Sequence, residues 1–142
     1  MAIEWTEDLA TGVNAIDNQH KELFQRINNL LDACNHGKGK EEVKKVICFL
    51  EDYVITHFSE EEKYMGKYDY SDYISHKRQH FEFMENFNRL KTQFEAEGPG
   101  IHIVVITNNL VVDWLRNHIR KMDRALGSFL KTKADQKKSI LE

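Results

Sequence analysis

Apolar residues recur at helical spacing along most of the chain. The N-terminal segment, residues 1–16, is expected to form an extended arm with Trp5 and Val13 as anchors. An amphipathic stripe after it predicts a helix over residues 18–35, with Asp17 as its N-cap. The stripe consists of Leu23, Ile27, Leu30, Leu31 and Cys34.

Three further stripes predict helices over residues 41–67, 71–96 and 101–121, and a short C-terminal helix is expected over residues 124–133. The connections between them are short and contain turn residues, such as Gly98-Pro99-Gly100. Short connections make consecutive helices antiparallel neighbours. The pattern therefore predicts an all-α fold: an antiparallel up-down-up-down four-helix bundle with an extended N-terminal arm and a short C-terminal helix.

Composition narrows the class of protein. The chain has 142 residues, 41% of them apolar and 30% charged, which is ordinary for one globular domain. A net charge of −3 gives no basic footprint for nucleic acid, and the longest apolar run, Ile103–Ile106, is too short to span a membrane. No signal-peptide pattern is present at the start, and Cys34 and Cys48 are expected to be buried small residues in a reducing compartment. We therefore expect a cytoplasmic location.

Seven polar side chains interrupt the apolar stripes. They lie near the start of the first helix, the end of the second, the start of the third and the end of the fourth, which share one end of such a bundle. At a rise of about 1.5 Å per residue, all of them fall within roughly 15 Å of that end. These residues are His20, His57, Glu61, His76, His80, His118 and Asp123.

Burying carboxylates and imidazoles without partners is unfavourable, and a bound cation removes the problem for all of them together. The spacing of His57 and Glu61, and of His76 and His80, places each pair on one face of a helix, so that both members reach the same ion or two adjacent ions. Imidazoles with carboxylates suit iron, copper, nickel or zinc. The sequence therefore predicts a metal centre.

The number of candidate donors indicates two ions. Seven donors exceed the four that one zinc ion takes. Glu60 and Glu62 flank Glu61 but are expected to point elsewhere on the helix, so they do not add to this number. Two carboxylates can each bridge a pair of ions, and five imidazoles then fill three terminal positions on one ion and two on the other. The second ion is left with a vacant position for a small molecule. Two carboxylates do not neutralise two divalent ions, so a bridging hydroxide is also expected.

Four segments resemble the hemerythrin family, and specifically its bacterial members. They are residues 17–24 (DNQHKELF), 57–65 (HFSEEEKYM), 76–80 (HKRQH) and 114–123 (WLRNHIRKMD). The resemblance extends from Trp5 to about Phe129, and each ligand position of the family carries the family's residue type. It implies one hemerythrin-like domain over residues 1–142, with a core of about 5–130 and a solvated tail over 131–142.

The resemblance also implies a non-haem di-iron centre. His76, His80 and His118 would hold the filled iron, and His20 and His57 the iron with the open position. Glu61 and Asp123 would bridge the two irons together with a hydroxide or oxide. A dry wall around the open position would be formed by Phe58, Leu115, Ile119, Leu23 and Trp114, which also pack the core.

Reversible binding of molecular oxygen, without enzymatic turnover, is the function that the resemblance implies, for oxygen storage, delivery or detoxification. A di-iron oxidase or peroxidase is disfavoured because such proteins use more carboxylates than the two available here. The residues are also compatible with an oxygen or redox sensor acting through a separate partner, a nitric-oxide binder, an iron-handling protein or a purely structural histidine cluster. No protein client can be named from the sequence.

Overall fold

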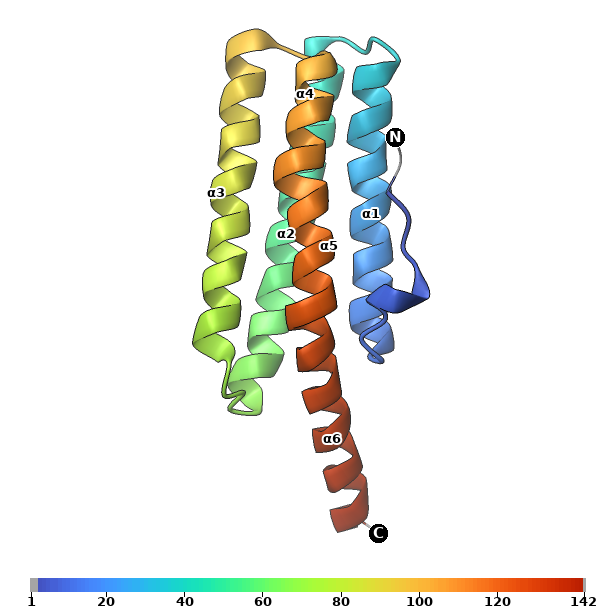
Figure 1. Cartoon of the computed structure of the whole chain (residues 1–142), viewed down its shortest axis with the longest axis vertical. Helices are drawn as coiled ribbons and strands as arrows, with labels where there is room; N and C mark the ends of the chain where they lie inside the picture. The colour runs from blue at the N-terminus through green and yellow to red at the C-terminus, as the bar shows by residue number, and fades with distance from the viewer. Residues whose placement is uncertain (1–2, 142) are drawn as a thin grey trace.

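The computed structural model describes the backbone of residues 3–141 and the side chains of residues 3–134. Three long helices, α1 (Asn14–Asn35), α2 (Lys40–Lys67) and α3 (Tyr73–Glu97), are followed by a fourth helical rod over residues 101–141 (Figure 1). Helix α1 packs against α2 and the fourth rod, and α3 packs against the same two elements from the other side. The predicted antiparallel four-helix bundle is confirmed.

The fourth rod is not a plain α-helix. It consists of α4 (Ile101–Ile106), the π-helical segment η2 (Thr107–Val112), α5 (Asp113–His118), the π-helical segment η3 (Ile119–Asp123) and α6 (Arg124–Leu141). Backbone angles stay in the right-handed helical region across each junction, for example −61° and −47° at His118. The C-terminal helix expected over 124–133 is present as α6, which joins the rod directly and extends to Leu141, past the end of the bundle (Figure 1).

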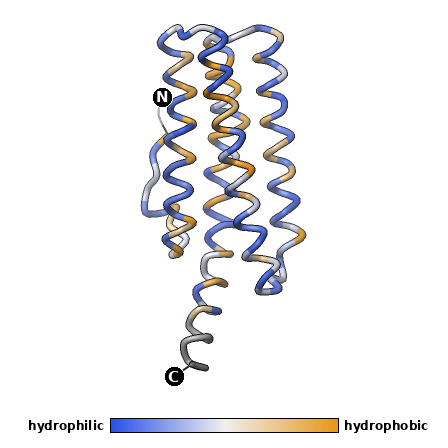
Figure 2. Tube along the Cα trace, turned by 180° about the vertical axis from the view of Figure 1, so that it is seen from behind, coloured by the Kyte–Doolittle hydropathy of each residue, from blue (hydrophilic) through white to orange (hydrophobic). Residues whose placement is uncertain are grey.

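Two groups of buried apolar side chains pack the interior. Hydrophobic positions recur along each helix among hydrophilic ones (Figure 2), and the larger group, the main core, fills most of the bundle between the four helices. A smaller group, the end cluster, consists of Ile16, Met65, Tyr70, Leu126 and Leu130. Along α1, α2 and the fourth rod, the five polar candidates that these elements carry fall between main-core residues and end-cluster residues, so apolar packing lies on both sides of them.

The N-terminal arm lies along the bundle and contains one 3-10 turn, η1 (Glu7–Leu9). Leu9 and Ile3 are buried, and the backbone of Ile3 exchanges two hydrogen bonds with the side chain of Asn28, at 2.8 and 2.9 Å. Trp5 packs against the main core and Val13 against the end cluster, as expected of anchors. The arm is thus a packed part of the fold.

Asp17 does not cap α1, contrary to the prediction. The helix begins at Asn14, and Asp17 lies in its first turn, where its Oδ1 accepts hydrogen bonds from the backbone N–H and the hydroxyl of Thr11, both at 2.8 Å. Thr11 is in turn pressed against α6, because a Cβ added to Gly127 would lie 2.2 Å from the carbonyl oxygen of Thr11. Asp17 and Gly127 therefore fix the arm between α1 and α6.

The cysteines and the lysine-rich end of the chain differ in part from expectation. Cys34 is half-buried, but Cys48 is exposed, so the prediction that both are buried is wrong for Cys48. Of the predicted tail, Lys131 is exposed and Lys133 half-buried, whereas Lys137 and Lys138 lie outside the residues whose side chains are described. No helix within residues 3–141 combines the length and apolar character needed to cross a bilayer.

Candidate metal centre

The structure brings the seven predicted polar residues into one buried layer across the bundle, and none of them is more than 3% exposed. All four helices of the bundle contribute: α1 through His20, α2 through His57 and Glu61, α3 through His76 and His80, and the fourth rod through His118 of α5 and Asp123 of η3. Their ligand-type atoms form two groups, each within 4.8 Å, that share Glu61 and Asp123. We call His76, His80 and His118 the three-histidine side, and His20 and His57 the two-histidine side.

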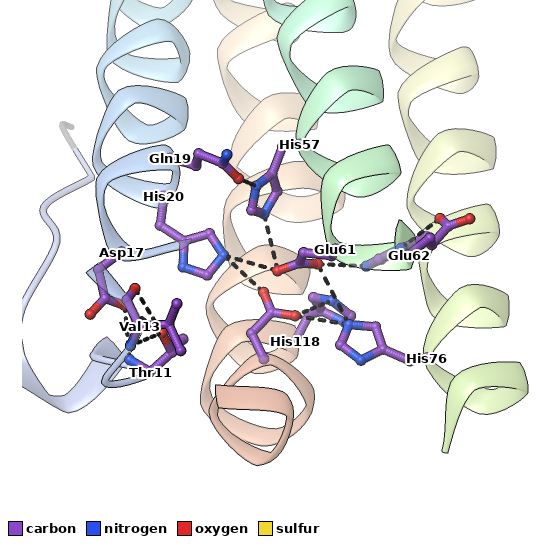
Figure 3. A network of polar contacts seen from close by, with 12 residues as sticks. Thr11, Val13, Asp17, Gln19, His20, His57, Glu61, Glu62, His76 and His118 are labelled. Carbon is purple, nitrogen blue, oxygen red and sulfur yellow. Dashed lines mark hydrogen bonds and ion pairs between the residues drawn. The ribbon is translucent and has the colours of Figure 1, made fainter. Parts of the chain in front are cut away.

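Glu61 lies between the two sides (Figure 3). Its Oε1 is 3.0 Å from Nε2 of His80 and 3.6 Å from Nε2 of His76. Its Oε2 is 3.3 Å from Nε2 of His57 and 3.7 Å from Nε2 of His20. The carboxylate thus directs one oxygen to each side.

Asp123 is placed in the same way. Its Oδ1 is 2.9 Å from Nε2 of His76 and 3.0 Å from Nε2 of His118, and its Oδ2 is 2.9 Å from Nε2 of His20. All five imidazoles therefore present Nε2 to the carboxylates. Two carboxylates that each span both groups have the geometry of a double bridge.

The two carboxylates reach the layer by different backbone routes. Glu61 follows His57 by four residues in regular α-helix, a spacing that stacks side chains on one face. Asp123 follows His118 by five residues, which in an α-helix turns the side chain about 140° away. The π-helical segment η3 replaces that geometry with i to i+5 hydrogen bonding, which brings the fifth residue back under the first.

Three of the imidazoles are held from outside the layer by residues that were not among the predicted donors. Gln19 Oε1 accepts a hydrogen bond from Nδ1–H of His57 at 2.7 Å, and Gln79 Oε1 accepts one from Nδ1–H of His118 at 2.8 Å. Such partners fix the ring orientation and leave Nε2 free to bind a metal. The sequence contains one sign of these partners, since Gln19 directly precedes His20 and Gln79 directly precedes His80.

Glu62 is the third outer partner. Its Oε2 accepts a hydrogen bond from Nδ1–H of His80 at 3.0 Å. From the sequence, Glu60 and Glu62 are both expected to point elsewhere on the helix than Glu61; Glu62 lies outside the inner layer, but from there it contacts the outer nitrogen of His80. Helical spacing from Glu61 excludes Glu62 from the inner layer but does not exclude contact with a ring that α3 brings to its side.

Charge in the layer without a cation is shared between the carboxylates and the rings. Burial raises the pKa values of Glu61 and Asp123, but the surrounding imidazoles outweigh it and lower both well below the usual range. Burial lowers the pKa of His20 and His76, but contacts with Asp123 and Glu61 raise each to about 9. For His118, burial dominates and lowers the pKa. The layer is thus built to hold positive charge between two anions.

Several buried atoms of the layer have no hydrogen-bond partner among the described residues. The inward-facing ones are Nε2 of His20, His57, His80 and His118, both oxygens of Glu61 and Oδ2 of Asp123; the outward nitrogens Nδ1 of His20 and His76 lack a partner as well. Buried polar atoms without partners are rare and need an explanation. Nitrogen and oxygen donors that converge in this way fit a bound metal pair.

Aromatic side chains cover the three-histidine side. Phe58 stacks on His80 with ring centroids 3.8 Å apart and planes at 6°, and Trp114 stacks on His118 at 4.6 Å and 14°. The indole N–H of Trp114 donates to Glu82 at 3.2 Å at the surface. Of the predicted wall residues, Leu23, Leu115 and Ile119 are fully buried in the main core, Phe58 is buried and Trp114 is half-buried.

The fold and this layer define a metal-binding four-helix bundle. Comparison with known proteins gives the family: the sequence profile of the Hemerythrin HHE cation binding domain matches residues 11–130. The chain is 35% identical over 127 residues to the bacteriohemerythrin of Methylococcus capsulatus, covering 89% of this chain and 95% of that protein. It is 38% identical over 120 residues to the bacteriohemerythrin of Pseudomonas aeruginosa, covering 84% and 75%.

Comparison with solved structures gives the same family. A crystal structure of a wild-type hemerythrin superimposes with a TM-score of 0.79 at 33% identity, covering 90% of this chain and 97% of that chain. The chain therefore belongs to the hemerythrin family, as the four sequence segments indicated.

Proposed function

We propose that the chain binds molecular oxygen reversibly at a pair of iron ions held in the buried layer. One observation carries the proposal: two groups of imidazoles of unequal size share the same two carboxylates, and each carboxylate directs one oxygen to each group. A pair of ions held in this way has one side with fewer protein donors, where a small molecule finds a vacant position. The chain belongs to the hemerythrin family, and the sequence segments that it shares with that family imply iron as the ion and oxygen as the ligand.

In this proposal the three-histidine side would hold one iron and the two-histidine side the other. Glu61 and Asp123 would serve both irons, since each directs one oxygen to either side, and a hydroxide or oxide would complete the centre. When bound, the ferrous pair supplies two electrons and an open coordination position for oxygen. Gln19 and Gln79 orient the rings of His57 and His118 so that Nε2 faces the layer.

The protein's further contribution is to exclude water. The layer lies between the main core and the end cluster, and an apolar shell controls solvent access and redox behaviour. We infer that Leu23, Leu115 and Ile119 form the wall beside the open position. Phe58 and Trp114, which stack on His80 and His118, cover the opposite side.

We infer binding without enzymatic turnover. The di-iron carboxylate enzymes use four glutamates together with two histidines, whereas this layer has five imidazoles and two carboxylates. Fewer anionic ligands give less stabilisation to the highly oxidised iron that substrate oxidation requires.

The test is an iron count and three visible spectra of the purified protein: reduced without air, after admission of air, and after degassing. We expect about two irons per chain and an absorption band that appears with oxygen and fades on degassing. His57→Ala should lose the band, and His36→Ala, which replaces an exposed histidine outside the layer, should keep it. Wild-type protein without iron after growth with ample iron would contradict the proposal, as would a band that does not reverse.

A further inference from the structure

The outer partners of the imidazoles differ in charge. His57 and His118 donate to neutral glutamine amides, Gln19 and Gln79, whereas His80 donates to the carboxylate of Glu62. The difference is not required by packing, because both kinds of side chain offer the same accepting oxygen. One ring of the layer is therefore held by an anion.

The ring of His80 connects two carboxylates. Its Nε2 lies 3.0 Å from Oε1 of Glu61 inside the layer, and its Nδ1 lies 3.0 Å from Oε2 of Glu62 outside it. Phe58 stacks nearly parallel on the ring and fixes its plane. Glu62 thus acts on the layer through a single rigid side chain.

Glu62 is open to its surroundings. Its side chain is 23% exposed, and Nζ of Lys77, itself 59% exposed, lies 4.0 Å from Oε1. Both residues line a groove of about 220 Å³ between α2 and α3, together with the exposed apolar side chains of Ile55 and Phe81. The carboxylate behind His80 therefore lies at the surface, whereas the carboxylates in front of it are buried.

We propose that Glu62 is a positioning residue that acts through His80 to strengthen metal binding on the three-histidine side and to lower the redox potential of the metal pair. The proposal rests on the function proposed above. An anionic acceptor on the outer nitrogen fixes the tautomer and makes the ring a stronger electron donor to a metal at Nε2. A stronger donor favours the ferric over the ferrous state.

The matched variants are Glu62→Gln, which keeps an accepting oxygen and removes the charge, and Glu60→Gln, which removes the same charge two residues away. We expect Glu62→Gln to release iron to a chelator about 10-fold faster or more, in line with other outer-shell substitutions. A 10-fold loss of ferric preference corresponds to a rise of about 59 mV in the one-electron potential. Glu60→Gln should leave both values unchanged. The reverse substitution, Gln79→Glu, should lower the potential.

A second measurement does not depend on oxygen binding. In metal-free protein, the 15N and proton signals of His80 Nδ1–H should shift in Glu62→Gln and stay in place in Glu60→Gln. If Glu62→Gln leaves both the His80 signals and the potential at their wild-type values, the proposal is overturned. If the wild-type protein does not bind oxygen reversibly but Glu62→Gln shifts these signals and chelator release, the proposed function fails and this inference stands.

Discussion

The two sides of the buried layer are built on the same carboxylates but differ in support. The three-histidine side takes its rings from α3 and α5, and stacked aromatic rings of Phe58 and Trp114 cover it. The two-histidine side takes its rings from α1 and α2, where His20 and His57 meet edge to face at 4.7 Å. Nδ1 of His20 has no partner among the described residues, and the turn that carries His20 is held by the N-terminal arm.

The two sides of the layer therefore differ although the carboxylates between them are arranged in the same way toward both. Glu61 and Asp123 each serve both sides, and because they come from α2 and η3, the layer ties all four helical elements together. The two sides differ because α3 and α5 contribute three rings and α1 and α2 contribute two, and because the rings have different contacts outside the layer.

Loss of a bridge should have the largest effect. Asp123→Ala removes the nearest carboxylate oxygen from His20, His76 and His118, so we expect iron on both sides to fall close to zero. Metal analysis of the purified variant measures this. Asp113→Ala, at an exposed position on the same rod, is the control. Retention of one iron per chain would show that the two sides bind independently of the shared carboxylate.

Loss of one imidazole from the two-histidine side should affect that side and leave the three-histidine side intact. His20→Ala removes one of two imidazoles from the two-histidine side and none from the other, so we expect iron to fall to about half and the oxygen-dependent band to disappear. Metal analysis and the visible spectrum report the two effects separately. Complete loss of iron would instead mean that the three-histidine side cannot hold its ion alone.

The arm gives a way to disturb the two-histidine side from a distance. In Gly127→Ala the new Cβ would lie 2.2 Å from the carbonyl oxygen of Thr11, so the arm must move, at a cost of about 1–3 kcal/mol in the free energy of unfolding. Gly66→Ala is the matched control, since its Cβ would make ordinary contact with Tyr73 at 3.5 Å, and we expect a gain of about 0.4–1 kcal/mol. Urea unfolding of both variants measures the difference, and equal values would exclude the close contact.

The smallest effect is expected on the three-histidine side. Trp114→Phe keeps an aromatic ring over His118 but loses the hydrogen bond to Glu82, which should reduce stability by about 0.5–1.5 kcal/mol and leave the iron content unchanged. Thermal unfolding and metal analysis together test it. A variant that loses iron would show that the indole itself, and not only a stacked ring, holds His118 in place.

Much of this architecture could be predicted because the information is local. Apolar residues at spacings of three and four predicted the helices, and polar residues on those stripes predicted the layer. Features that depend on neighbouring helices could not be read in this way. The contact of Glu62 with His80 joins α2 to α3, and the role of Asp17 depends on where the arm returns.

The π-helical segments of the fourth rod could not be predicted, for a related reason. Hydrophobic periodicity assumes 3.6 residues per turn, so a π-helical segment is invisible to it. The spacing of five between His118 and Asp123 was the one visible sign, because no α-helical face contains both.

The π-helical segment η3 makes the length of the chain between His118 and Asp123 a functional property. Deleting one residue there would let an unbroken α-helix form, with the carboxylate at the same spacing that Glu61 has from His57. If η3 instead kept all its residues and became regular α-helix, every residue beyond it would rotate by about 100° about the helix axis. Gly127 would turn away from Thr11, and Leu126 would leave the end cluster. The π-helical geometry of η3 therefore sets the phase between the metal layer and the end cluster, and neither can change its register alone.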